Sequence, residues 1–220
     1  MKNWRGNGGD DDKSGKGGGG GNSGGNTRPP PDEKRIDVTV AFDRALTPAE
    51  TQALLDFKAA VVANTQAING LAATDHVTLA DGSVITGSEL KALWAKTDFI
   101  VNENNHTYLN ATSRGEANYN NGNPKVSFNI DLMESYDIWG VNGMQFLSFH
   151  ELGHITQAGR NSNLNIDADH NGVVSEPERL NNEHLANDTA AALLNRAGVV
   201  LGPGFVVEGN FSTPPAVFVP

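Results

Sequence analysis

The chain has 220 residues, no cysteine and a formal net charge of −10. This length allows one domain with a hydrophobic core, and the lack of cysteine excludes disulfides, thiolate metal ligands and a cysteine nucleophile. The acidic balance argues against a nucleic-acid backbone or an anionic membrane surface as partner, and no run of about 18 apolar residues could span a membrane. Any bound metal must therefore be held by His, Asp, Glu or backbone oxygen.

The chain begins with a stretch rich in Gly, Asp and Pro, residues 1–35, which cannot bury apolar surface. We predict a disordered tether there, followed by one domain over residues 36–220. No apolar segment follows Met1, so the sequence shows no conventional signal peptide. The acidic, cysteine-free composition and a calcium motif described below favour an extracellular setting. Secretion by another route and a cytoplasmic location are both compatible with these features.

The first elements of the domain are predicted to be a strand and a long helix. Residues 36–42 alternate apolar and polar side chains, as a half-buried strand does. Thr47, Pro48 and Glu50 form a capping box with proline at the first helical position. A helix should therefore run from Pro48 to about Ile68.

A hairpin, a short helix and a buried strand are expected next. Residues 76–87 place apolar positions on both sides of the turn dipeptide Asp81-Gly82, which predicts a β-hairpin. Ser88 should cap the short helix, and residues 99–101 form a short apolar run typical of a buried strand.

The middle of the chain leads to the most informative motif. Residues 102–124, rich in Asn, Gly and Thr, are predicted to form a long irregular loop, and such loops are often functional. Residues 125–130 alternate again and predict a second strand with one buried face. A connection containing Tyr136 and Trp139 then leads to a helix.

That helix carries the sequence HELGH, which reads H-E-x-x-H. On a helix, His150 and His154 lie one turn apart on the same face and can bind one Zn²⁺. Glu151 lies beside them, placed to act as general base on a water at the metal. Gly159 should end the helix.

A catalytic zinc site usually has a third protein ligand. Residues 181–194 predict a helix whose apolar face also carries Glu183. A carboxylate on an inward face is costly unless it is paired or bound to metal, so Glu183 is the predicted third ligand. Asp188 and then His184 are the alternatives, rotated from Glu183 by about 140° and 100° toward the flanks of the helix.

The segment between the two helices matches D-x-D-x-N-G-x5-E, the EF-hand calcium loop, over residues 167–178. The ligands to Ca²⁺ would be the backbone carbonyl of Val173 and the side chains of Asp167, Asp169, Asn171, Ser175 and Glu178. Because Glu178 begins the helix that carries Glu183, we predict that bound calcium organises the zinc site.

The combination of HELGH with the pattern E-x-x-A-N-x-x-A-x-x-L-L, which starts at Glu183, resembles the zinc metallopeptidases called gluzincins, and most closely the small peptidase domains of the ImmA/IrrE type. The resemblance covers residues 125–194. It implies His150, His154 and Glu183 as zinc ligands and Glu151 as base. The sequence departs from the thermolysin-like pattern at Asn187, where aspartate is common, and in the calcium-loop insert.

The order of elements predicts an α+β domain with a small twisted mixed sheet, a backing helix and an active-site helix. The resemblance makes this a zincin-like domain in which residues 125–130 form the edge strand that pairs with extended substrate. The last residues, 202–220, are expected to be extended chain packed on the domain.

These features predict a zinc-dependent endopeptidase acting on a peptide or protein substrate and stabilised by bound calcium. The alternative is a non-catalytic calcium-binding interaction or adhesion module on a zincin scaffold, against which the intact Glu151 argues. Hydrolysis of a non-peptide substrate is a third reading. The sequence specifies neither cleavage preference nor oligomeric state. The candidate oxyanion donors are His106, Tyr108, Tyr119 and Tyr136.

Overall fold

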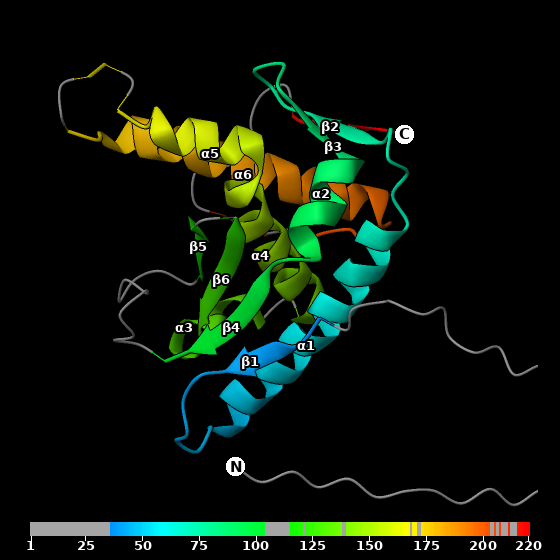
Figure 1. The fold of residues 1–220 in the computed structure, drawn as a ribbon. Coiled ribbons are helices and arrows are strands. Elements are labelled where there is room, and N and C mark those ends of the chain that lie inside the picture. The colour runs from blue at the N-terminus through cyan, green and yellow to red at the C-terminus, as the bar shows by residue number, and fades with distance from the viewer. Residues whose placement is uncertain are drawn as a thin grey trace, which may run out of the picture. The chain divides into compact units, whose positions relative to one another are not determined.

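The structure is a computed structural model that describes residues 36–103, 115–120, 122–137, 140–167, 169–170, 173–202, 205, 207, 211 and 215–220. The tether predicted at 1–35 lies outside these residues. The described chain forms helices and two sheets (Figure 1). None of its helices is both long and apolar enough to cross a membrane.

The larger sheet has four strands in the order β1-β4-β6-β5. Strands β1 (Val38–Val40), β4 (Asp98–Asn102) and β6 (Asn123–Asn129) are parallel to their neighbours in this set, and β5 (Gly115–Asn120) pairs antiparallel with β6. The sheet is therefore mixed, which confirms the predicted α+β class.

The prediction that residues 125–130 form the edge strand is wrong. They belong to β6, an interior strand, and Ile130 already begins helix α3 (Ile130–Asp137). The chain reverses before β6, where Gly122 has a φ of 81°. Part of the predicted irregular loop thus becomes β5 and covers the edge of β6.

Helix α1 (Pro48–Asn69) follows the predicted bounds closely and begins with the predicted capping box. The hydroxyl of Thr47 accepts a hydrogen bond from the Glu50 amide at 3.2 Å, and the Glu50 carboxylate accepts one from the Thr47 amide at 2.7 Å. Helix α1 and helix α4 (Gly140–Ile155) cover one face of the four-stranded sheet (Figure 1). Among the core contacts, the ring centroids of Phe57 and Phe128 are 4.3 Å apart.

Arg44 ties the start of α1 to the end of β4 and the start of α3. Its guanidinium donates to Glu50 and Asp131, each at 2.7 Å, and to Glu103 at 2.9 Å. Hydrogen bonds from Arg44 and from the Thr47 amide lower the pKa of Glu50 from 4.5 to about 2. A carboxylate whose pKa is depressed in the folded state stabilises the protein above its unfolded pKa and loses this contribution as the pH falls toward the folded value.

Glu50→Gln should therefore lower the melting temperature at pH 7 and lose this effect as the pH approaches 2. Glutamine at this position can still complete the capping box, so the variant removes mainly the charge. Thermal unfolding of both proteins between pH 7 and pH 2 measures the difference. A difference that does not change over this range would contradict the role of the ionised carboxylate.

The second sheet has the order β3-β2-β7. Strands β2 (His76–Thr78) and β3 (Val84–Thr86) form the predicted hairpin, and the turn residue Gly82 has a φ of 82°. The extended C-terminal segment contributes β7 (Val217–Val219), which pairs antiparallel with β2.

Helix α2 (Gly87–Trp94) starts two residues earlier than predicted. Its N-cap is Thr86, whose hydroxyl accepts from the Glu89 amide at 3.1 Å, and not Ser88. Strand β3 leads straight into this helix, because the extended backbone of Thr86 serves both as strand end and as cap.

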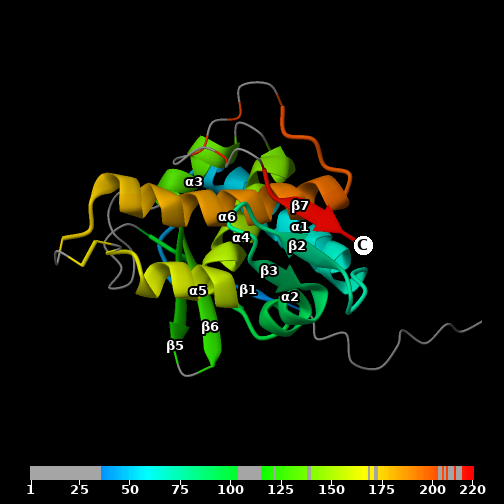
Figure 2. The same ribbon diagram turned by 90° about the horizontal axis from the view of Figure 1, so that it is seen from above.

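The helix with HELGH ends at Ile155, so the prediction that it ends at Gly159 is wrong. Thr156 breaks it and caps helix α5 (Gln157–Leu164), with its hydroxyl accepting from the Gly159 amide at 3.0 Å. Helix α6 (Glu176–Arg196) is longer than the predicted 181–194 and runs beside α5 (Figure 2).

Candidate metal centre

Helix α4 is fixed to α1 by a buried polar network one turn before the histidines. The Asn64 side-chain nitrogen donates to the Gln145 carbonyl at 2.9 Å and to the Ser148 hydroxyl at 2.7 Å. The Gln145 amide returns a hydrogen bond of 2.9 Å to Asn64. Because every member is buried, the network specifies one register of α4 on α1. It thereby fixes the depth at which His150 and His154 lie.

Helix α6 approaches α4 closely because the HELGH segment contains Gly153. A Cβ at this position would lie 2.8 Å from Ala186 Cα and 3.3 Å from Thr189 Cβ. Only glycine permits this spacing of the two helices without displacement. The close contact brings the face of α6 that carries Glu183 and Asn187 against the histidines.

The ligand atoms of three side chains meet at this contact. His150 Nε2 and His154 Nε2 are 3.2 Å apart, and a carboxylate oxygen of Glu183 lies 3.3 Å from the first and 3.8 Å from the second. The side chains are partly buried, with exposed fractions of 13%, 17% and 21%. The structure therefore brings together the three zinc ligands predicted from the sequence, as a candidate metal site.

The triangle of donor atoms has the size that tetrahedral zinc requires. Zn–N and Zn–O bonds of about 2.0–2.1 Å in a tetrahedron place neighbouring ligand atoms about 3.3 Å apart. The three measured separations of 3.2, 3.3 and 3.8 Å lie close to this value. Two imidazoles and one carboxylate also suit zinc, whereas calcium and magnesium prefer oxygen ligands.

Two asparagines of α6 lie behind the histidines. Asn187, which is fully buried, accepts a hydrogen bond from His150 Nδ1 at 2.8 Å. The proton is thereby held on Nδ1, which leaves Nε2, on the side of Glu183 and His154, as the nitrogen that can bind a metal. The Asn182 amide lies 3.4 Å from His154 Nδ1, and Asn182 Oδ1 has no hydrogen-bond partner among the described residues. Turning this amide by 180° lets Oδ1 accept from His154 and fixes the same tautomer there.

Asn187→Ala should weaken zinc binding by about 10–100-fold, because the loss of a residue that hydrogen-bonds to a metal ligand typically lowers metal affinity by this factor. The wild-type and variant affinities can be compared by competition with a chromophoric chelator. Asn181→Ala is the matched control, since Asn181 lies on the same helix but lines a cavity away from the two histidines. Equal affinities of Asn187→Ala and wild type would show that Asn187 does not orient His150.

The charges of the three side chains are coupled. Burial lowers the pKa of His150, but the hydrogen bond with Glu183 and the charges of Glu151 and Glu183 outweigh burial and raise it. Burial raises the pKa of Glu183, but the hydrogen bond with His150 and the charges of His154, His150 and Arg179 together outweigh burial and lower it. The pKa of His154 falls to about 4 through burial and the charge of His150. When His150 is protonated it forms an ion pair with Glu183, and a bound dication would displace that proton.

Glu151 lies on α4 next to the triad formed by His150, His154 and Glu183, and it is only 4% exposed. Burial raises its pKa to about 7, opposed by the charge of His150 and reinforced by Glu183 and Glu116. Its side chain faces Gly115, at the start of β5. A buried carboxyl group that titrates near neutral pH is suited to proton transfer.

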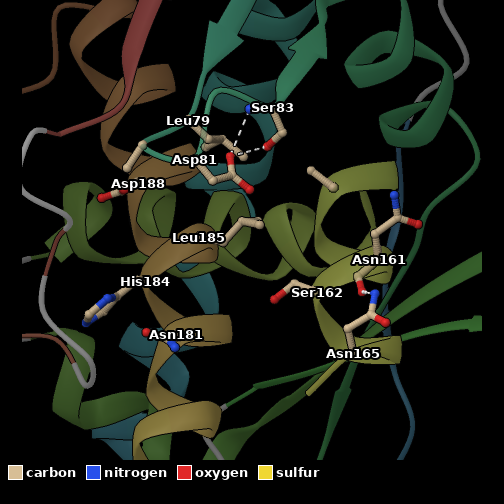
Figure 3. A pocket seen from close by; sticks show the side chains of 12 residues that line it. Leu79, Asp81, Ser83, Asn161, Ser162, Asn165, Asn181, His184, Leu185 and Asp188 are labelled. Carbon is tan, nitrogen blue, oxygen red and sulfur yellow. Dashed lines mark hydrogen bonds between the residues drawn. The ribbon is translucent and has the colours of Figure 1, made fainter. Parts of the chain in front are cut away.

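The two alternative ligands do not join the triad. Asp188 and His184 line a cavity of about 490 Å³ between the β2–β3 turn, α5 and α6 (Figure 3). Asp188 is also buried, at 2% exposure, so the flank of the helix on which it was predicted is covered by neighbouring elements. The face of α6 toward β2 and α5 is itself covered, which the helical period alone does not reveal.

The predicted calcium loop contains a second candidate metal site. Carboxylate oxygens of Asp167, Asp169 and Glu178 lie within 4.8 Å of one another. The Glu178 carboxylate also accepts hydrogen bonds from the Ser175 amide at 2.8 Å and the Ser175 hydroxyl at 2.7 Å. The backbone of Val173 is described, but Asn171 lies outside the described residues.

Of the four candidate oxyanion donors, Tyr119 has a described side chain. The Tyr119 ring lies 4.1 Å from the guanidinium carbon of Arg160. His106 and Tyr108 lie outside the described residues, as does the side chain of Tyr136. Sequence reasoning missed Asn182, although its position directly before Glu183 and four residues before the inward Ala186 indicated the same buried face.

Comparison of the chain with family models, with curated proteins and with solved structures finds no match. The described residues themselves combine two imidazoles and a carboxylate at metal-binding distance with a buried carboxyl group on the same helix. This arrangement can hold a Lewis-acidic cation and move a proton beside it.

Proposed function

We propose that the protein is a zinc-dependent endopeptidase of the gluzincin type. The observation that carries this proposal is the triangle formed by His150, His154 and Glu183, with Glu151 on the same helix as both histidines. Three protein ligands leave the fourth tetrahedral position to water, as in catalytic rather than structural zinc sites. The HELGH motif and the E-x-x-A-N helix add the family resemblance.

Zinc held by the triad would supply a Lewis acid that polarises the scissile carbonyl and lowers the pKa of a bound water toward 7. Glu151 would accept the proton of that water and donate it to the leaving amine. Burial raises the pKa of Glu151 in the metal-free site, and a carboxylate with a raised pKa accepts a proton more readily. Asn187 would keep His150 in the ligand tautomer throughout.

A non-catalytic calcium-binding module is the second candidate, favoured by the cluster of Asp167, Asp169 and Glu178. Such a module has no use for a buried carboxyl group beside the histidines, and burying one without a role is costly. The position of Glu151 therefore supports the enzyme.

The proposal is tested by metal content and cleavage together. We expect purified protein to hold one zinc per chain and to cleave casein and members of a quenched-fluorescent peptide library. A zinc chelator should stop cleavage, and zinc should restore it. Bound zinc without cleavage of any probe would favour the non-catalytic module, and chelator-resistant cleavage would exclude a zinc mechanism.

We also propose that residues 167–178 bind Ca²⁺ and hold the start of α6. Glu183 follows Glu178 by five positions on the same helix, so ordering the loop would fix the helix that presents the third zinc ligand. Oxygen ligands and an EF-hand spacing favour Ca²⁺ over zinc at this second site.

Glu178→Gln should abolish the rise in melting temperature that millimolar Ca²⁺ gives the wild type, since a ligand that binds only the folded state stabilises it. Glutamine retains the capping interaction with Ser175, so the helix itself is preserved. Mg²⁺ at the same concentration is the control. An equal calcium-dependent rise in both proteins would exclude this loop, and unchanged zinc affinity with calcium removed would exclude the coupling.

A further inference from the structure

Gly115, the first residue of the edge strand, lies directly against the carboxylate of Glu151. A Cβ built on Gly115 would overlap the Glu151 Oε1 atom and would lie 2.8 Å from Cδ and 3.1 Å from Cγ. Contacts below 3.0 Å are essentially never seen for real Cβ atoms. Any residue other than glycine would therefore displace the carboxylate or the strand.

The backbone conformation does not account for this glycine. Gly82 and Gly122 occupy turns with φ of 82° and 81°, where glycine is favoured for its backbone freedom, but Gly115 has no positive φ. Glycine is unfavourable inside a strand and often marks the close approach of another group. Here that group is the Glu151 side chain.

Both elements that make the contact are held by interactions of their own. Strand β5 is held by its ladder with β6, in which Gly115 is the partner of Phe128. Helix α4 is held against α1 by the network of Asn64, Gln145 and Ser148. Glu151 itself is 4% exposed, so its side chain is buried where it meets β5.

We propose that Gly115 is a positioning residue for Glu151. The missing side chain lets β5 close over the carboxylate, which confines it to one orientation and keeps solvent from its outer side. The consequence for hydrolysis rests on the proposed peptidase function, whereas the confinement of the carboxylate does not. The strand that covers the edge of the sheet thus also sets the geometry of the proposed general base.

Gly115→Ala tests this inference. We expect kcat for a library-selected quenched-fluorescent peptide to fall by about 10²-fold, the usual cost of displacing a catalytic group by about 1 Å. Zinc content and KM should stay at wild-type values, because the three atoms nearest to a Cβ at Gly115 all belong to Glu151 and none to a zinc ligand. Gly202→Ala is the matched control: no atom of the described residues lies within 4 Å of a Cβ there, so this variant should match the wild type.

A compensating substitution separates positioning from general damage to the fold. Glu151→Asp shortens the side chain by one methylene and vacates the space that a Cβ at residue 115 needs. If the residues act together, Gly115→Ala and Glu151→Asp should lower kcat by less in combination than the product of their separate effects. Multiplicative losses, or wild-type kcat in Gly115→Ala, would overturn the proposal.

A crystal structure of Gly115→Ala gives a readout that does not depend on activity. We expect the Glu151 carboxylate to be displaced while the triad keeps its spacing. An unmoved carboxylate and strand would overturn the positioning role. A displaced carboxylate in a protein whose wild type cleaves no probe would leave the positioning role standing and would refute the peptidase function.

Discussion

Replacing Glu151 with glutamine should lower kcat/KM for peptide cleavage by about 10²–10⁴-fold while the protein still binds one zinc per chain. Glutamine has nearly the same shape, so it fits beneath Gly115, but it cannot accept and return a proton. Glu151 is adjacent to the triad without being one of its donors, so the metal should be retained. Burying the ionised carboxylate also costs free energy of folding. The uncharged variant should therefore unfold at an equal or higher temperature than the wild type above pH 7.

The matched control is Glu116→Gln, which removes a neighbouring negative charge on β5. Glu116 is exposed and contributes only through its charge to the raised pKa of Glu151. This variant should retain most of the cleavage activity. Zinc content by elemental analysis and initial rates on the same peptide distinguish the two. If Glu151→Gln cleaved peptides at the wild-type rate, Glu151 would not be the general base.

Replacing Glu183 with glutamine should weaken zinc binding by more than about 100-fold. Even the loss of a residue that only hydrogen-bonds to a metal ligand lowers metal affinity by about 10–100-fold. Glu183 places an oxygen 3.3 Å and 3.8 Å from the two imidazole nitrogens and supplies the negative charge of the site. Cleavage should be lost together with the metal, in contrast to Glu151→Gln, where only cleavage is lost.

Asp188→Asn and His184→Ala are the controls for this substitution, because both residues lie on the same helix and were alternative ligands. Their side chains line the cavity on another face of α6, so both variants should bind zinc as the wild type does. Competition with a chromophoric chelator gives all four affinities. Zinc loss in Asp188→Asn, together with normal binding in Glu183→Gln, would reverse the assignment.

The parts of the fold that the sequence predicted well depend on local patterns. The capping box at Thr47 and the helix that follows are specified within a few residues. The i, i+4 spacing of His150 and His154 needs only a helix, and the inward position of Glu183 follows from the helical period of its neighbours. Two local predictions therefore sufficed to indicate the three side chains that meet.

The parts that were missed depend on contacts between distant segments. The sequence of β5, GEANYN, contains Gly and Asn, which are depleted in strands, and it becomes a strand only by pairing with β6. The end of α4 was misplaced because Thr156 both breaks one helix and caps the next. The hydrogen bond from His150 to Asn187 and the contact of Gly115 with Glu151 join different elements. No local pattern specifies such contacts.

The central claim is that zinc is bound by His150, His154 and Glu183, and X-ray absorption at the zinc edge tests it most directly. Protein loaded with one equivalent of zinc should show about two imidazole nitrogens at about 2.0–2.1 Å and oxygen ligands at about 2.0–2.2 Å in a four-coordinate shell. The same measurement on Glu183→Gln should show an altered shell or no stoichiometric zinc. A shell of oxygens without imidazole in the wild type, or an unchanged shell in Glu183→Gln, would contradict the claim.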